Sequence, residues 1–135
     1  MSIYGRQVPV PALAALVVLL VVGGLLPVLS STPAQEIVLV ADGMAFRVEG
    51  GPASANPVIE VRAGEIVRIV LRNEERGMQH DFAVPALGVA LDLVAWTDQR
   101  TLTFVAPSEP GDYEYICRPH QLMMRGVLRV LPAGR

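Results

Sequence analysis

A cysteine, a histidine and two methionines fall within eight residues near the carboxyl end of the chain. These residues are Cys117, His120, Met123 and Met124. Cys117 is the only cysteine of the 135 residues, and the only other histidine is His80, which lies far upstream. A single cysteine excludes an intramolecular disulfide, a zinc site built on cysteine pairs and a c-type haem motif. The residue types that remain point to a site for a soft transition metal.

Copper fits this set of residues. A trigonal site of two imidazoles and one thiolate, with a weak bond to a thioether, suits an ion that changes between two oxidation states. Cys117, His120 and a methionine on one tight loop have little freedom, and His80 closes the site from a distant segment. Taken singly, each residue has an ordinary role in a protein core. Together they predict one type 1 copper ion.

The elements that must position these residues are strands. Beyond residue 35, short β-branched segments alternate with Gly, Pro, Asn and Asp. This spacing is typical of an all-β sandwich or barrel of Greek-key type with about seven to eight strands. The stretch 86–96 allows a short helical turn. The charged residues near His80 are expected to form a solvated loop without a role; they are Glu74, Glu75, Arg76 and Asp81. The predicted strands are residues 37–40, 58–61, 66–71, 82–84, 102–105, 113–116 and 127–131.

The amino-terminal segment predicts a membrane anchor. Residues 8–29 carry no charged side chain, and such a helix of some 22 residues would reach roughly 33 Å, enough to cross a bilayer. Arg6 precedes it, which favours a cytoplasmic amino terminus and an exported domain. We therefore expect residues 1–35 to comprise the cytoplasmic terminus, the anchor and a short tether before a domain of residues 36–135. The alternative is secretion after signal cleavage near Ala34.

The metal-binding stretch resembles the cupredoxins. The motif is Gly-Asp-Tyr-Glu-Tyr at residues 111–115, then Cys-x-x-His, a methionine, Arg-Gly and a terminal strand. It is most similar to amicyanin, plastocyanin and pseudoazurin, and the resemblance extends over residues 36–135. It implies an eight-stranded Greek-key sandwich that holds one copper ion. It also implies that His80, Cys117 and His120 are the equatorial ligands.

Two methionines compete for the axial position. Amicyanins place two residues between histidine and methionine, and plastocyanins place four. Here Met123 and Met124 follow His120 after two and three residues. The Met-Arg-Gly sequence of amicyanins matches residues 124–126, so we predict Met124 as the axial ligand, with an insertion in the loop. Met123 would then belong to an apolar rim.

These features predict a membrane-tethered one-electron carrier rather than an enzyme. The domain would lie on the periplasmic or extracellular face, with redox partners such as a cytochrome or a membrane oxidoreductase. The net charge of −2 and the lack of a basic run argue against nucleic acid. Partners are expected to dock on an apolar patch around His120. The predicted members of this patch are Pro85, Ala86, Leu87, Pro119, Leu122 and Met123.

A copper-delivery or storage protein without a redox role remains the alternative. Such proteins bind cuprous ion through thioethers, and Met44, Met78, Met123 and Met124 leave this possibility open. Enzymatic copper centres fit less well. A binuclear centre needs a second cysteine, and a copper nitrite reductase needs further histidines.

Overall fold

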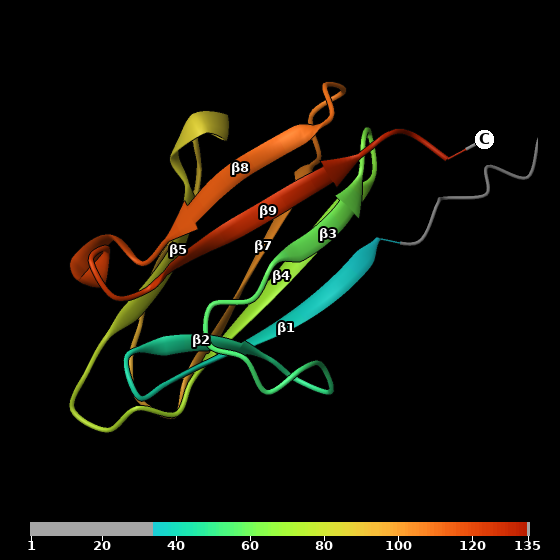
Figure 1. The fold of residues 1–135 in the computed structure, drawn as a ribbon. Coiled ribbons are helices and arrows are strands. Elements are labelled where there is room, and N and C mark those ends of the chain that lie inside the picture. The colour runs from blue at the N-terminus through green and yellow to red at the C-terminus, as the bar shows by residue number, and fades with distance from the viewer. Residues whose placement is uncertain (1–33, 135) are drawn as a thin grey trace, which may run out of the picture. The chain divides into compact units, whose positions relative to one another are not determined.

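Two β-sheets pack face to face in the computed structural model, which describes residues 34–134 (Figure 1). The first sheet has the order β2 (Ala45–Val48), β1 (Gln35–Asp42), β4 (Ile66–Asn73) and β7 (Gln99–Val105). The second has the order β3 (Ile59–Arg62), β9 (Arg125–Leu131), β8 (Gly111–Ile116), β5 (His80–Val84) and β6 (Val89–Val94). Two short 3₁₀ turns, η1 (Pro85–Leu87) and η2 (Arg118–His120), follow β5 and β8. The chain crosses between the two sheets repeatedly, so most strands that are neighbours within a sheet are not consecutive in sequence.

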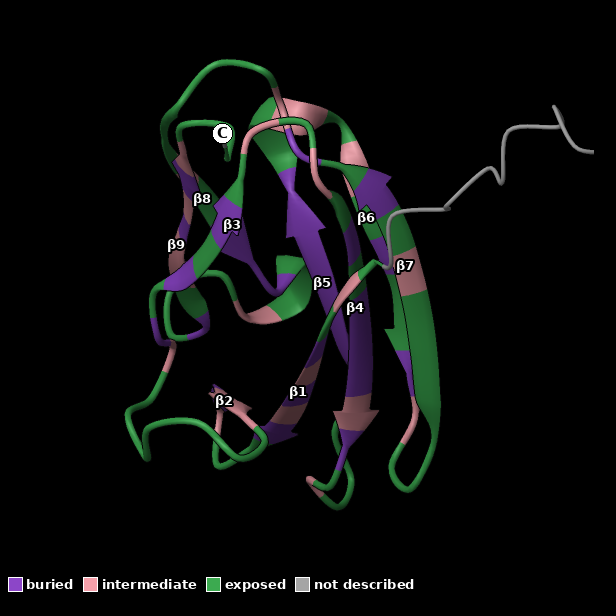
Figure 2. Cartoon of the chain, turned by 90° about the vertical axis from the view of Figure 1, so that its right-hand side faces the viewer, coloured by how far each residue is buried: buried purple, intermediate pink, exposed green. Residues whose placement is uncertain are grey.

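Strand pairing places sequence-distant segments side by side. The pairs β1–β4 and β3–β9 are parallel, and the other pairs are antiparallel. In β4, the side chains of Val67, Ile69 and Leu71 point inward and are fully buried. Strand β5 is buried along its whole length, whereas β7 is mostly exposed (Figure 2). The strand that begins with His80 is therefore among the best-shielded parts of the sandwich.

Three aromatic rings pack together in the core beneath the metal-binding end of β8. Phe82 and Tyr115 stack with ring centroids 5.3 Å apart, and Phe46 meets both rings edge-on. The buried Tyr115 hydroxyl donates a hydrogen bond to the Pro57 carbonyl oxygen at 2.6 Å. Gly126 lies opposite Tyr115 on β9, and a Cβ there would collide with the Tyr115 ring. Glycine at this position therefore lets the aromatic ring lie flat against the neighbouring strand.

The all-β sandwich is confirmed, and each of the seven predicted strands is present. The predicted number of about seven to eight strands is too low, because residues 34–134 form nine strands, of which β2 and β6 were not predicted. Strand β2 follows a two-residue turn in which Gly43 and Met44 both have positive φ, as in the tight hairpin turns that match strand twist. The helical turn expected within residues 86–96 is present at the start of this stretch, as η1. Strand β6 occupies the middle of the stretch and was not predicted. It forms because it pairs with β5, and tertiary pairing outweighs weak local preference.

The predicted anchor at residues 8–29 lies outside the described residues. Within residues 34–134, no helix is long and apolar enough to cross a bilayer. The anchor therefore stays a prediction from the sequence.

Candidate metal centre

The three predicted equatorial ligands come from two places in the second sheet. His80 is the first residue of β5, Cys117 directly follows β8, and His120 is the last residue of η2. Cys117 and His80 are separated by 37 residues and are both fully buried, whereas His120 is half-buried. The sandwich thus brings a distant strand start against the loop that carries the Cys-x-x-His motif.

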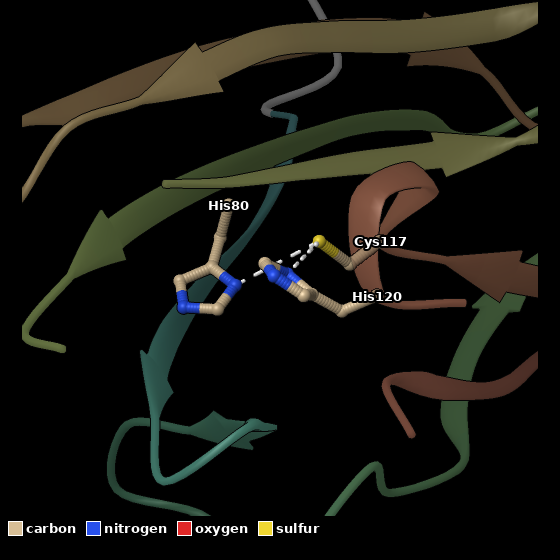
Figure 3. A group of neighbouring side chains, drawn as sticks. All are labelled: His80, Cys117 and His120. Atoms are coloured by element: carbon tan, nitrogen blue, oxygen red, sulfur yellow. Dashed lines mark hydrogen bonds between the residues drawn. The ribbon is translucent and has the colours of Figure 1, made fainter. Parts of the chain in front are cut away.

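Both imidazole rings direct Nδ1 at the same sulfur (Figure 3). The Cys117 Sγ atom lies 3.7 Å from His80 Nδ1 and 3.6 Å from His120 Nδ1. The two ring centroids are 4.9 Å apart. One ligand atom from each of the three residues lies within 4.8 Å of the others.

These separations fit a metal ion between the three side chains. Metal–imidazole bonds of about 2.0–2.1 Å and a metal–thiolate bond of about 2.3 Å, set at 120°, put nitrogen and sulfur about 3.7 Å apart. The two N–S distances agree with this value. The structure therefore brings together the three residues that the sequence singled out, in a geometry compatible with a trigonal site.

Backbone hydrogen bonds hold the loop between β8 and β9 closed. The Cys117 amide donates to the Met124 carbonyl oxygen at 2.9 Å, and the Met124 amide donates to the His120 carbonyl oxygen at 2.9 Å. Met124 is fully buried in the core cluster that contains Cys117, whereas Met123 is 59% exposed. Burial agrees with Met124 as the inward-facing methionine and with Met123 at the rim. The axial assignment itself remains a prediction.

The loop before β5 contacts His80 at Nε2, the ring nitrogen that does not face Cys117. The buried Asn73 side chain donates to the carbonyl oxygens of Met78 and Val94, and it accepts from the Glu75 amide. The Glu75 carboxylate in turn lies 3.0 Å from His80 Nε2. Carboxylate partners of this kind orient metal-binding imidazoles in other metal sites.

A second carboxylate joins the two ligand-bearing segments. Asp81, the residue after His80, is 1% exposed. It accepts from the Arg118 amide at 2.7 Å and from Arg118 Nε at 2.6 Å. Because Arg118 follows Cys117 directly, this contact links the start of β5 to η2.

The expectation that the charged residues around His80 form a solvated loop without a role was therefore partly wrong. Glu74 fits it, since it is exposed and bonded to Arg72. Glu75 and Asp81 do not, because their side chains are 18% and 2% exposed and contact the site. Their proximity to His80 in sequence was the available signal, but sequence alone could not show which way the carboxylates turn.

Burial shifts the pKa values of two candidate ligands, and only the shift of His80 suits a metal site. It lowers the pKa of His80, against the opposing effect of Glu75, and so favours the neutral imidazole that metals require. It also raises the pKa of the Cys117 thiol. A bound metal ion would overcome this second effect, because a coordinating thiol is deprotonated outright.

His120 borders an opening of about 300 Å³ at the surface. The exposed side chains of Leu122 and Met123 give this opening an apolar character. Three predicted members of the patch do not line it, because residues 85–87 form η1 at the opposite end of β5 from His80. The lining residues are Met44, Pro119, His120, Gln121, Leu122 and Met123.

Comparison with known proteins decides the family. The family described as Cupredoxin-like domain matches residues 13–130. The chain belongs to this family. The copper prediction is likewise confirmed, since the cluster of His80, Cys117 and His120 in this cupredoxin is compatible with one type 1 copper ion.

Solved structures share the fold of this cupredoxin. Auracyanin B is similar with a TM-score of 0.59 and 24% identity, over 77% of this chain and 94% of that chain. A variant of amicyanin in its reduced Cu(I) form gives a TM-score of 0.50 and 25% identity, over 76% and 88%. The metal-binding domain of a Cu(I)-exporting P-type ATPase of Streptococcus pneumoniae D39, with Cu(I), gives 0.54 and 15%, over 71% and 84%. No curated protein matches the chain in sequence.

Proposed function

We propose that this cupredoxin is a membrane-tethered type 1 copper protein that carries single electrons between extracytoplasmic redox partners. The convergence of two imidazole nitrogens on the Cys117 sulfur, at 3.6 and 3.7 Å, carries the proposal. A copper ion bound there would alternate between its cuprous and cupric states. Electron transfer is fast only when the ligands barely move between those states.

Rigidity of the ligand set supports a carrier. The Cys117–Met124 loop is closed by backbone hydrogen bonds, and Asp81 ties the loop to the strand that bears His80. Such cross-links limit how far the ligands rearrange when the charge on the site changes. The half-buried His120 at the apolar opening provides a short route to a partner, and redox encounters use small, short-lived interfaces.

The tether and its orientation belong to the proposal on sequence grounds. An anchor at residues 8–29 would hold the domain beside its donor and acceptor, and would raise their effective concentration. The opening around His120 would receive a cytochrome or a membrane oxidoreductase. Separation of membranes from soluble fractions tests this part, because a secreted, cleaved protein would leave the membrane pellet.

Electron paramagnetic resonance on the copper-loaded chain tests the central claim. A trigonal thiolate site gives an intense blue colour and a narrow copper hyperfine splitting. Cys117→Ser removes the thiolate and should abolish both. An ordinary tetragonal copper signal that is the same in the parent and in Cys117→Ser would contradict the proposal.

A copper-delivery role is the second candidate, and one observation favours it. The thioether residues Met44 and Met123 line the opening beside His120, and thioethers select cuprous ion. A delivery protein would stay colourless and pass Cu(I) to an acceptor. A blue protein that exchanges electrons while it retains its copper would exclude delivery as the main role.

A further inference from the structure

The Glu75 carboxylate makes two contacts through one oxygen. Its Oε2 atom lies 3.0 Å from His80 Nε2 and accepts a hydrogen bond from the Met44 amide at 2.9 Å. The Glu75 amide donates to Asn73 Oδ1, which fixes the backbone from the other side. The carboxylate therefore connects His80 to the turn between β1 and β2, although Met44 in that turn is 31 residues from Glu75 in sequence.

This contact determines which nitrogen of His80 carries the proton. A carboxylate oxygen only accepts hydrogen bonds, so Nε2 must be the donor in this pair. A neutral imidazole with its proton on Nε2 leaves the Nδ1 lone pair free. Nδ1 is the atom that faces the Cys117 sulfur at 3.7 Å. The hydrogen bond at Nε2 thus leaves Nδ1 unprotonated and able to bind a metal.

The same contact reaches a residue with an uncommon backbone conformation. Met44 has a φ of 56°, in the left-handed region that residues other than glycine rarely adopt. Its amide points at the carboxylate, and its side chain lines the opening beside His120. Glu75 therefore contacts both the buried ligand and the rim of the surface opening.

We propose that Glu75 is a positioning residue that fixes the Nε2-protonated tautomer of His80 and, through its negative charge, favours the oxidised state of the bound ion. The inference rests on the proposed type 1 copper site. A negative charge on a side chain that is 18% exposed acts on a nearby ion with less screening than a charge on an exposed side chain. Glu75 should therefore lower the reduction potential of the site.

The neighbouring Glu74 offers a matched control. It has the same charge and adjoins Glu75 in sequence, but its side chain is 51% exposed and bonded to Arg72. Glu74→Gln and Glu75→Gln remove the same charge from the full chain at adjacent positions. In Glu75→Gln the amide oxygen can still accept from His80 Nε2, so the charge is removed while the hydrogen bond remains. Glu75→Ala removes both.

Two measurements test the proposal on the full chain. Nitrogen-15 NMR of the copper-free protein reports the His80 tautomer. We expect protonated Nε2 in the parent and in Glu75→Gln, and a mixture of tautomers in Glu75→Ala. Redox titration of the copper-loaded protein should show a higher potential in Glu75→Gln. At a fixed ambient potential, the ratio of oxidised to reduced copper should fall about tenfold in Glu75→Gln and less than about twofold in Glu74→Gln.

Each alternative outcome overturns a different claim. Equal shifts in Glu75→Gln and Glu74→Gln, or a parent protein with His80 protonated on Nδ1, would overturn the role of Glu75. A chain that never becomes blue with copper would overturn the proposed function instead. The tautomer measurement needs no copper, so it still tests the positioning of His80 in that case.

Discussion

Substitution of Asp81 offers a direct test of how the two ligand-bearing segments are joined. Asp81→Ala removes the acceptor of both Arg118 contacts at 2.7 and 2.6 Å. Loss of the acceptor for the part-buried amide should cost about 1–2 kcal/mol. The guanidinium contact adds at most about 1 kcal/mol, because the Arg118 side chain is 52% exposed and water screens it. We expect the free energy of unfolding to fall by about 2 kcal/mol.

Two companion variants separate the backbone contact from the ion pair. Asp81→Asn keeps an oxygen for the Arg118 amide, and Arg118→Ala keeps the amide itself. Asp81→Asn should therefore lose only the charged contact, which is about 1 kcal/mol or less. Arg118→Ala loses this contact together with the long hydrogen bond from its guanidinium to the Leu91 carbonyl oxygen at 3.3 Å. Denaturant unfolding of the copper-free chain, followed by far-ultraviolet circular dichroism, gives all three values. If Arg118→Ala destabilised the protein as much as Asp81→Ala, the ion pair and not the backbone contact would be the main link, and the reasoning would fail.

Three further predictions concern the axial ligand, the core and acid stability. Met124→Leu should change the visible and paramagnetic resonance spectra of the copper-loaded protein and Met123→Leu should not, because only Met124 is buried; equal spectral changes would contradict the axial assignment. Gly126→Ala should lower the free energy of unfolding by about 1–3 kcal/mol, because its methyl group meets the Tyr115 ring; an unchanged melting temperature would refute this. The copper-free protein should lose stability as pH falls below about 6.5, because burial lowers the pKa of His80 in the folded state only. Denaturant titrations from pH 8 to 5 check this sign, and a stability that rises toward pH 5 would contradict it.

Much of the sandwich could be predicted because its strands carry their own signal. The segments that became β4 and β9 are β-branched and bounded by turn residues, and each predicted segment is a strand in the structure. Strand β2 is only four residues long and β6 has weak β-branched content, so neither stands out locally. The Asp42-Gly43 pair before β2 was a usable hairpin signal that the sequence analysis did not take up.

The candidate site divides in a similar way between local and distant information. Cys117, His120 and Met124 occupy one loop of a few residues, so their chemical types and spacing could be read directly from the sequence. The orientation of Glu75 and Asp81 could not be read in this way. Acidic residues next to a turn are usually solvated, and only contacts with remote backbone groups show that these two are not.

The sequence by itself determined the chemical identity of the site, because one cysteine and two histidines leave a single way to assemble a thiolate and two imidazoles. It also determined that the folded part is made of strands, since the alternation of side chains is a local property. Only the tertiary structure decided that His80 Nδ1 meets the Cys117 sulfur across 37 residues of chain and that Met123 lies outside while Met124 lies inside. It likewise decided that the Glu75 carboxylate lies 3.0 Å from His80 Nε2. These features depend on how the two sheets and their connecting loops pack, and that packing is a sum of contacts between residues far apart in sequence.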